Sequence, residues 1–216
     1  MTNSSALALA AGAVLVCAVS VLWLTTVRSV IRAVALQGIA LGAVALILGV
    51  HEHDAGLVAT ALVVMVLKGA VIPLLLGRSG GPDAMTRENR PLVNVPASLV
   101  VAGVLIVVAL VTTRGLGRFV GTTAGMLVPL GVATLLIGFF VLVTRRRPVF
   151  QIVGLVMVDN GIALVAFLST AGVPFLIELG VSLDIFLGVV MLMVLTRRLR
   201  AEFGDVDLDE LQELRD

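Results

Sequence analysis

The sequence predicts an all-α protein that crosses a membrane several times, and three observations support this fold class. Of the 216 residues, 59% are hydrophobic and only 13% are charged, and the mean hydropathy is +1.15. Soluble domains average about 25% charged residues, so this chain has too little charge to cover a globule in water. The apolar residues also gather in long runs separated by short polar breaks. These observations exclude a soluble enzyme, a nucleic-acid-binding protein and a disordered chain.

Seven apolar stretches reach the length of about 20 residues that a helix needs to cross the hydrocarbon core. The expected spans are 6–27, 30–50, 55–77, 92–113, 120–144, 149–170 and 175–196. Charged and turn-forming residues mark the expected breaks, at 28–32, 51–54, 78–91, 114–118, 145–148 and 171–174. The first run has no basic segment before it and is too long for the apolar part of a signal peptide, so we expect it to remain as a span.

The arginines predict the orientation of these spans. With seven spans, twelve of the fourteen arginines fall on one side, and only Arg114 and Arg118 fall on the other. Because cytoplasmic loops concentrate Lys and Arg, we expect the N-terminus outside the cell and the C-terminus in the cytoplasm. Residues 1–200 would form the transmembrane domain. Residues 201–216 would form a short acidic cytoplasmic tail, either an amphipathic helix or a frayed terminus.

A weak internal repeat suggests pseudo-symmetry within the transmembrane domain. Arg, Val, a large apolar residue, Val and Leu recur in register when residues 28–37 are compared with residues 147–156. The segments 6–77 and 120–196 would then be two parallel three-helix units, linked by the span 92–113.

Four ionisable residues fall at membrane depth. Lys68, Asp159 and Asp184 lie near the middle of their expected spans, and Glu178 lies about one turn inside the outer end of the last span. At about 1.5 Å per residue, the first three lie at a similar depth. Because intramembrane ionisable groups mark ion or proton pathways by default, we predict that these four residues form a proton relay.

Two alternatives stay open for these charges. Lys68 and one aspartate could form an ion pair that only fixes helix packing, and Glu178 could be an ordinary carboxylate at the membrane surface. The sequence also leaves open whether Lys68 pairs with Asp159 or with Asp184.

The remaining polar residues predict little chemistry. A single Cys17 provides neither a disulfide nor a zinc or iron–sulfur site, and residues 51–54 (His-Glu-His-Asp) are expected to form a solvated outer turn rather than a metal site. Gln37 and Asn160 are expected to hydrogen-bond across helices. We therefore expect no catalytic residue, cofactor or metal in this chain.

Small residues and prolines within the spans predict local packing features. Gly38 and Gly42 have a small-xxx-small spacing that we interpret as ordinary close packing of helices. Pro73 and Pro129 lie within expected spans, where we expect them to kink the helices.

The charged motifs in spans three, six and seven resemble a known family. Residues 147–198 are similar to the K component of respiratory complex I and to the C component of Mrp-type cation/proton antiporters. The whole chain resembles component E of hydrogenase-4, a membrane protein of formate hydrogenlyase and other group 4 nickel–iron hydrogenases. The matching features are Lys68 followed five residues later by Pro73, the triplet 159–161 (Asp-Asn-Gly), the spacing of Glu178 and Asp184, and the short tail.

This resemblance implies a non-catalytic membrane subunit of an oxidoreductase complex in a prokaryotic cell membrane, with a role in proton translocation. Nickel–iron and iron–sulfur centres would belong to partner subunits, and antiporter-like membrane subunits would be its neighbours. Asp184 matches the family's acid in the last helix. Asp159 lies about one turn deeper than the acid of complex I, and Lys68 has no counterpart in the three-helix relatives.

Two other functions remain open on the same residues. The chain could belong to a cation/proton antiporter complex, or it could be a structural adaptor of a membrane arm without a relay role.

Overall fold

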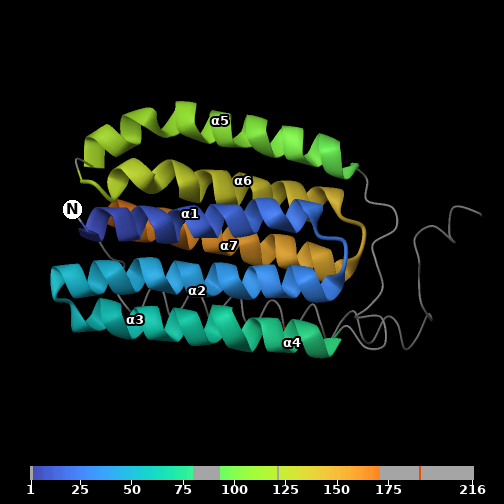
Figure 1. Ribbon diagram of the computed structural model, residues 1–216, viewed down its shortest axis with the longest axis horizontal. Helices are drawn as coiled ribbons and strands as arrows, with labels where there is room; N and C mark the ends of the chain where they lie inside the picture. Colours follow the sequence, from blue (N-terminus) through green and yellow to red (C-terminus); the bar gives the residue numbers. More distant parts are fainter. Residues whose placement is uncertain (1, 80–92, 121, 171–189, 191–216) are drawn as a thin grey trace, which may run out of the picture.

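The structure is a computed structural model that describes residues 2–79, 93–120, 122–170 and 190, and within these residues it is built from helices lying side by side (Figure 1). Their bounds are α1 Thr2–Trp23, α2 Val27–Glu52, α3 Ala55–Val66, α4 Ile72–Ser79, α5 Val95–Val120, α6 Val128–Thr144 and α7 Pro148–Thr170. A π-helical turn, η1 (Leu67–Val71), joins α3 to α4, and a 3₁₀ turn, η3 (Gly125–Leu127), precedes α6.

Six helical segments are long and apolar enough to cross a membrane. They are Ser4–Trp23, Val27–Glu52, Ala55–Arg78, Val95–Thr113, Gly125–Thr144 and Pro148–Ser169. These segments coincide with six of the seven predicted spans to within a few residues. The seventh predicted span, 175–196, lies outside the described residues, apart from residue 190. The length and composition of the six helices are those of a membrane protein.

The predicted break at 28–32 is wrong. Helix α1 ends at Trp23 and α2 begins at Val27, so the connection is residues 24–26, where Thr26 is extended (φ −95°, ψ 136°). Arg28 and Arg32 therefore lie in the first turns of α2. The expected break at 114–118 is also helical, because α5 continues to Val120. Arginine is a good helix former, so these charges mark where a helix leaves the apolar layer, and the helix itself need not end there.

The turn between α2 and α3 is built from the polar residues that precede the third span. His53 has left-handed backbone angles (φ 54°, ψ 31°) and ends α2. The Asp54 carboxylate then caps α3 by accepting hydrogen bonds from the backbone N–H groups of Gly56 (2.8 Å) and Leu57 (3.2 Å). Asp54 thus has a structural role in this turn.

Helices α6 and α7 pack with their backbones in contact. Each carries two glycines spaced seven residues apart, Gly131 and Gly138 on α6 and Gly154 and Gly161 on α7. A Cβ atom at Gly138 would lie 2.7 Å from the backbone nitrogen of Val158, which is closer than real Cβ contacts. This seam holds α7 in the centre of the bundle. Of the six apolar segments, the one in α7 is 72% buried, whereas the one in α5, at the edge, is only 17% buried (Figure 1).

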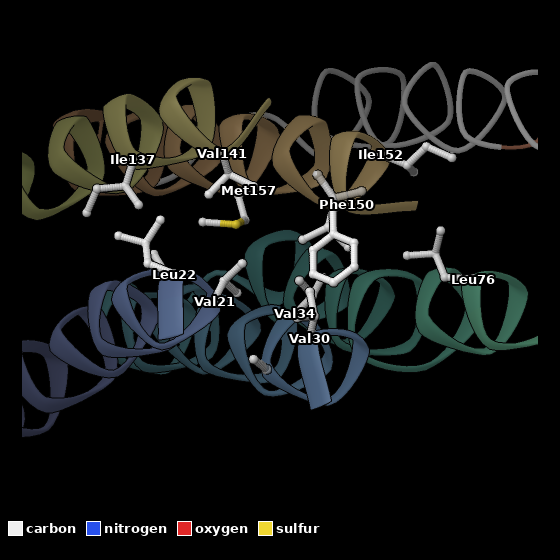
Figure 2. Packing of buried hydrophobic residues seen from close by; sticks show 14 of the residues in the cluster. Val21, Leu22, Val30, Val34, Leu76, Ile137, Val141, Phe150, Ile152 and Met157 are labelled. Atoms are coloured by element: carbon white, nitrogen blue, oxygen red, sulfur yellow. The ribbon is translucent and has the colours of Figure 1, made fainter. Parts of the chain in front are cut away.

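The core between the helices is apolar. Figure 2 shows the side chains of Leu22 (α1), Ile137 (α6) and Met157 (α7) pointing into the same space. Phe150 of α7 points toward Val34 of α2 in the same cluster. α7 therefore packs on α6 and α2, and its Met157 side chain lies in the same cluster as Leu22 of α1.

Arg145 lies in the expected break at 145–148 and is buried, unlike its neighbour Arg146. It follows α6, is only 4% exposed, and donates hydrogen bonds to the last-turn carbonyls of α1, Val21 O (3.2 Å) and Leu22 O (3.0 Å). Its guanidinium also lies 5.3 Å from the centre of the Phe150 ring. The carbonyls at a helix C-terminus have no partner within the helix and carry partial negative charge, which explains why a buried cation is tolerated there.

Most of the described arginines lie at one end of the bundle, and Arg114 and Arg118 lie near the other end, as the predicted topology requires. The connection between α1 and α2, the end of α4 and the connection between α6 and α7 lie at one end of the bundle (Figure 1). The C-terminal end of α5 lies at the opposite end. That the first of these ends faces the cytoplasm is a prediction from the arginine distribution.

Candidate functional site

An ion pair lies in the middle of the bundle. Lys68 Nζ is 2.7 Å from Asp159 Oδ2, and the two side chains are 0% and 2% exposed. Asp159 lies eleven residues from each end of α7 (Pro148–Thr170), and Lys68 lies eleven residues before the end of α4 at Ser79. The structure therefore pairs Lys68 with Asp159, a choice that the sequence left open.

A glycine on α2 brings a third backbone against this pair. A Cβ atom at Gly38 would lie 2.5 Å from the carbonyl carbon of Lys68, so no larger residue fits without moving the helices. At Gly42, one turn further along α2, a Cβ atom would lie 3.1 Å from Ala61 O. Both glycines thus serve helix packing within this chain, in agreement with their interpretation as close-packing residues.

Lys68 lies in the π-helical turn rather than in regular α-helix. The Ile72 N–H donates to Leu67 O, five residues back, where an α-helix would use the residue four back. Pro73 follows directly and has no N–H to donate to Gly69. The sequence predicts a kink at Pro73, and the structure shows a widened turn just before it. Such turns occur frequently at functional sites.

Pro129, the other proline expected to produce a kink, lies in the first turn of α6. The missing N–H of a proline costs little at this position, so the prediction of a kink within a span is wrong there.

Two buried amides bond across the bundle, and one of them, Asn160, follows Asp159 directly on α7. Asn160 Nδ2 donates to Gln37 Oε1 (3.0 Å), and Gln37 Nε2 donates to the α1 carbonyl Val14 O (3.2 Å). Gln37 and Asn160 are 1% and 0% exposed. These bonds confirm that both amides bond across helices, and they join α1, α2 and α7. We call Gln37, Lys68, Asp159 and Asn160 the mid-bundle polar cluster.

The Lys68–Asp159 pair keeps a net charge of zero in the interior as long as no proton is added to it or removed from it. A carboxylate and an ammonium at 2.7 Å can remain charged or share a proton as a neutral pair. Separating them would leave each charge uncompensated in a low-dielectric environment, which costs several kcal/mol (about 3–5 when one partner is removed). Opening the pair is therefore favourable only when a proton, an ion or another charged group compensates for the separation.

The other predicted relay residues, Asp184 and Glu178, lie outside the described residues, so their roles stay predictions. Within the described part of the chain, no group of three or more His, Cys, Asp or Glu side chains is placed to hold a metal. The sequence identified Lys68 and Asp159 by their charge and depth. It gave no signal that Gln37 and Asn160 bond to each other, because spacing along one helix does not show which helix it faces.

Comparisons with known proteins give a relative along nearly the whole chain and matches over a shorter segment. No family model and no solved structure matches the chain. The chain is 30% identical over 80 residues to hydrogenase-4 component E of Escherichia coli (strain K12) and of Shigella flexneri, which covers 37% of each chain. The expected whole-chain resemblance to component E is therefore shown over about a third of the chain, as a distant similarity.

One relative that matches along nearly its full length is the uncharacterized protein Rv0085 of Mycobacterium tuberculosis (strain ATCC 25618 / H37Rv). The two sequences are 42% identical over 208 residues, which cover 96% of this chain and 94% of the relative. Since this similarity runs along nearly the whole of both chains, the protein belongs to the family of the mycobacterial protein Rv0085.

Proposed function

We propose that the protein is a non-catalytic membrane subunit of a hydrogenase-4-like, complex-I-related complex and that it contributes to proton translocation. Two findings support the class of complex: the membrane-spanning helices and the distant similarity to hydrogenase-4 component E. The observation that carries the role is the buried Lys68–Asp159 pair at mid-height in the bundle.

The physical argument for a relay starts from the cost of burying charge. Replacing a buried ion pair by well-packed apolar residues is often neutral or stabilising, so stability alone gives no reason to keep Lys68 and Asp159. Charged groups within membrane helices are rare and mark proton or ion pathways. In this proposal a proton arriving at Asp159 neutralises the carboxylate and frees the Lys68 ammonium, which then gives its own proton to the next acceptor of the relay.

Asp184 and Glu178 would extend the relay along the last predicted span. Electron transfer would take place on nickel–iron and iron–sulfur centres of partner subunits, and the neighbours in the membrane would be antiporter-like subunits. The protein would sit in a prokaryotic cell membrane with its C-terminus in the cytoplasm.

Purification of the chain from its native membranes tests the proposed complex. An affinity tag on the chain, with extraction in mild detergent, is expected to recover antiporter-like membrane subunits together with a metal-containing hydrogenase-like module, identified by mass spectrometry. Recovery of antiporter subunits without any redox module would favour a cation/proton antiporter complex. Recovery of the chain alone would contradict the proposal.

The carboxylate in the last predicted span provides a separate test of the relay. Asp184→Asn is expected to leave the complex assembled but to lower proton uptake by inverted membrane vesicles driven by the redox substrate of the complex. The near-isosteric amide keeps the size of the side chain and removes its ability to ionise. Unchanged proton uptake at normal levels of assembled complex would remove Asp184 from the relay.

A structural adaptor is the second candidate, and the mid-bundle polar cluster itself favours it. Lys68 and Asp159 compensate each other, and the amides of Gln37 and Asn160 bond across three helices. These contacts could simply fix the register of the helices. The two candidates differ in what happens when the pair is made neutral as a pair, since only a relay would then stop.

A further inference from the structure

The hydrogen bond to Val14 O fixes how the Gln37 amide is oriented, and the Gln37 amide in turn fixes how the Asn160 amide is oriented. The carbonyl oxygen of Val14 can only accept, so Gln37 must direct its Nε2 toward α1 (3.2 Å). Its Oε1 then faces α7 and can only accept, so Asn160 must present Nδ2 to it (3.0 Å). The carbonyl oxygen of Asn160 is consequently turned away from Gln37.

The side-chain oxygen of Asn160, Oδ1, is buried without a hydrogen-bond donor among the described residues. Asn160 is 0% exposed, and among the described residues no donor lies within hydrogen-bonding reach of its Oδ1. Buried carbonyl oxygens in proteins nearly always accept a hydrogen bond, and an ordered water is the usual donor where no protein group serves. Because the side chain is fully enclosed, a separate partner protein could not reach the oxygen without rearranging the helices.

The position of the oxygen connects it with the ion pair. Asn160 follows Asp159 on α7, and Gly38, which follows its partner Gln37 on α2, lies against the backbone of Lys68. The Asn160–Gln37 bond and the Lys68–Asp159 pair thus use adjacent residues of α7, and the residue after Gln37 on α2 packs against the backbone of Lys68. A donor held at Asn160 would therefore lie near the turn of α7 that carries the Asp159 carboxylate.

We propose that the carbonyl oxygen of Asn160 binds a buried water molecule beside the Lys68–Asp159 pair, and that Gln37 is a positioning residue that turns this oxygen toward the water. The role of this water, which is to bring an exchangeable proton to Asp159, rests on the proposed function. A water fits this site better than a metal cation does, because the Lys68 ammonium, 2.7 Å from Asp159, would repel a second positive charge.

A map of the purified complex that resolves ordered water, recorded by electron cryomicroscopy in sodium-free buffer, tests the site without requiring turnover. We expect density within about 2.7–3.2 Å of Asn160 Oδ1 and in hydrogen-bonding reach of Asp159 or Lys68. Absence of this density, a protein side chain in its place, or density that appears only with added sodium would overturn the proposal.

Two variants show whether Gln37 positions the site. Gln37→Leu removes the acceptor of the Asn160 amide, so the water density should be lost or displaced. Thr134→Val is the matched control, because Thr134 is equally buried but its hydroxyl donates to Leu130 O of its own helix (2.8 Å), so the water should stay. Water retained unmoved in Gln37→Leu would overturn the positioning role, and if that variant does not assemble, the wild-type map still decides the site.

The two proposals fail separately. A complex that holds the water but does not translocate protons would contradict the proposed function alone. A complex that translocates protons while Asn160 is dry would contradict this site alone.

Discussion

Lys68 and Asp159 show how two residues that are unfavourable alone become acceptable together. Each charge would be costly in the apolar interior, but at 2.7 Å they compensate each other. The compensation depends on both partners, so removing either one leaves the other as an uncompensated buried charge, which lowers the free energy of unfolding. Their removal as a pair has a different consequence from the removal of one member.

A double-mutant cycle should show this coupling. Lys68→Met or Asp159→Leu alone is expected to lower the free energy of unfolding by about 3–5 kcal/mol, because each leaves a buried charge without its counter-ion. The double variant should be within about 1 kcal/mol of the wild type or more stable, since apolar replacements of buried pairs are often neutral. Thermal unfolding of the detergent-solubilised chain measures these effects. Additive losses in the double variant would show that the two residues do not interact.

Arg145 is buried like Lys68 and Asp159, but its role can be tested by a single substitution. Its two hydrogen bonds to the carbonyls of α1 predict that Arg145→Met lowers the free energy of unfolding by about 1.5–3 kcal/mol, the range for hydrogen bonds to charged groups. The exposed Arg32 of α2 is the control, and Arg32→Met should change stability by less than about 0.5 kcal/mol. Equal melting temperatures for the two variants would contradict the capping role.

At the scale of the helices, glycines determine which backbones meet. Gly131, Gly138, Gly154 and Gly161 let α6 and α7 touch, and Gly38 lets α2 approach the π-helical turn. Without this contact, α7 could not hold Asp159 against Lys68 on one side and Asn160 against Gln37 on the other. The site is therefore a consequence of small residues that have no chemistry of their own.

Alanine at one of these glycines should separate the helices. Gly138→Ala places a Cβ atom 2.7 Å from the backbone of Val158 and is expected to cost about 1–3 kcal/mol of unfolding free energy, as overpacked cores do. Gly103→Ala on α5 is the matched control, because nothing lies within 4 Å of its added Cβ atom. The control should be neutral or about 0.5–1 kcal/mol more stable, given the higher helix propensity of alanine. A Gly138→Ala variant as stable as the control would refute the contact.

At the scale of the whole molecule, the helices were more predictable than the contacts between them. Long apolar runs located six spans to within a few residues, because the membrane demands a continuous apolar length. Charge was a poorer guide to helix ends, as Arg28 within α2 shows. The burial of Arg145 under α1 and the pairing of Lys68 with Asp159 depend on which helices are neighbours, and residue spacing within one helix does not contain that information.

The predicted orientation and the seventh span can be tested together with reporter fusions. A fusion of alkaline phosphatase after residue 172 should be active, because the end of α7 is predicted to face outward. A fusion of green fluorescent protein after residue 200 should be fluorescent, because the chain is predicted to return to the cytoplasm. The same reporter active at both positions would show that 175–196 does not cross the membrane.

The most direct test of the central claim is proton uptake by inverted membrane vesicles that contain the Lys68→Met/Asp159→Leu double variant. The amount of assembled complex and the rate of electron transfer are measured on the same vesicles. If the pair belongs to a relay, the complex should assemble at wild-type levels and proton uptake per electron should fall to background. Wild-type proton uptake per electron by the assembled double variant would contradict the account and leave the pair a purely structural role.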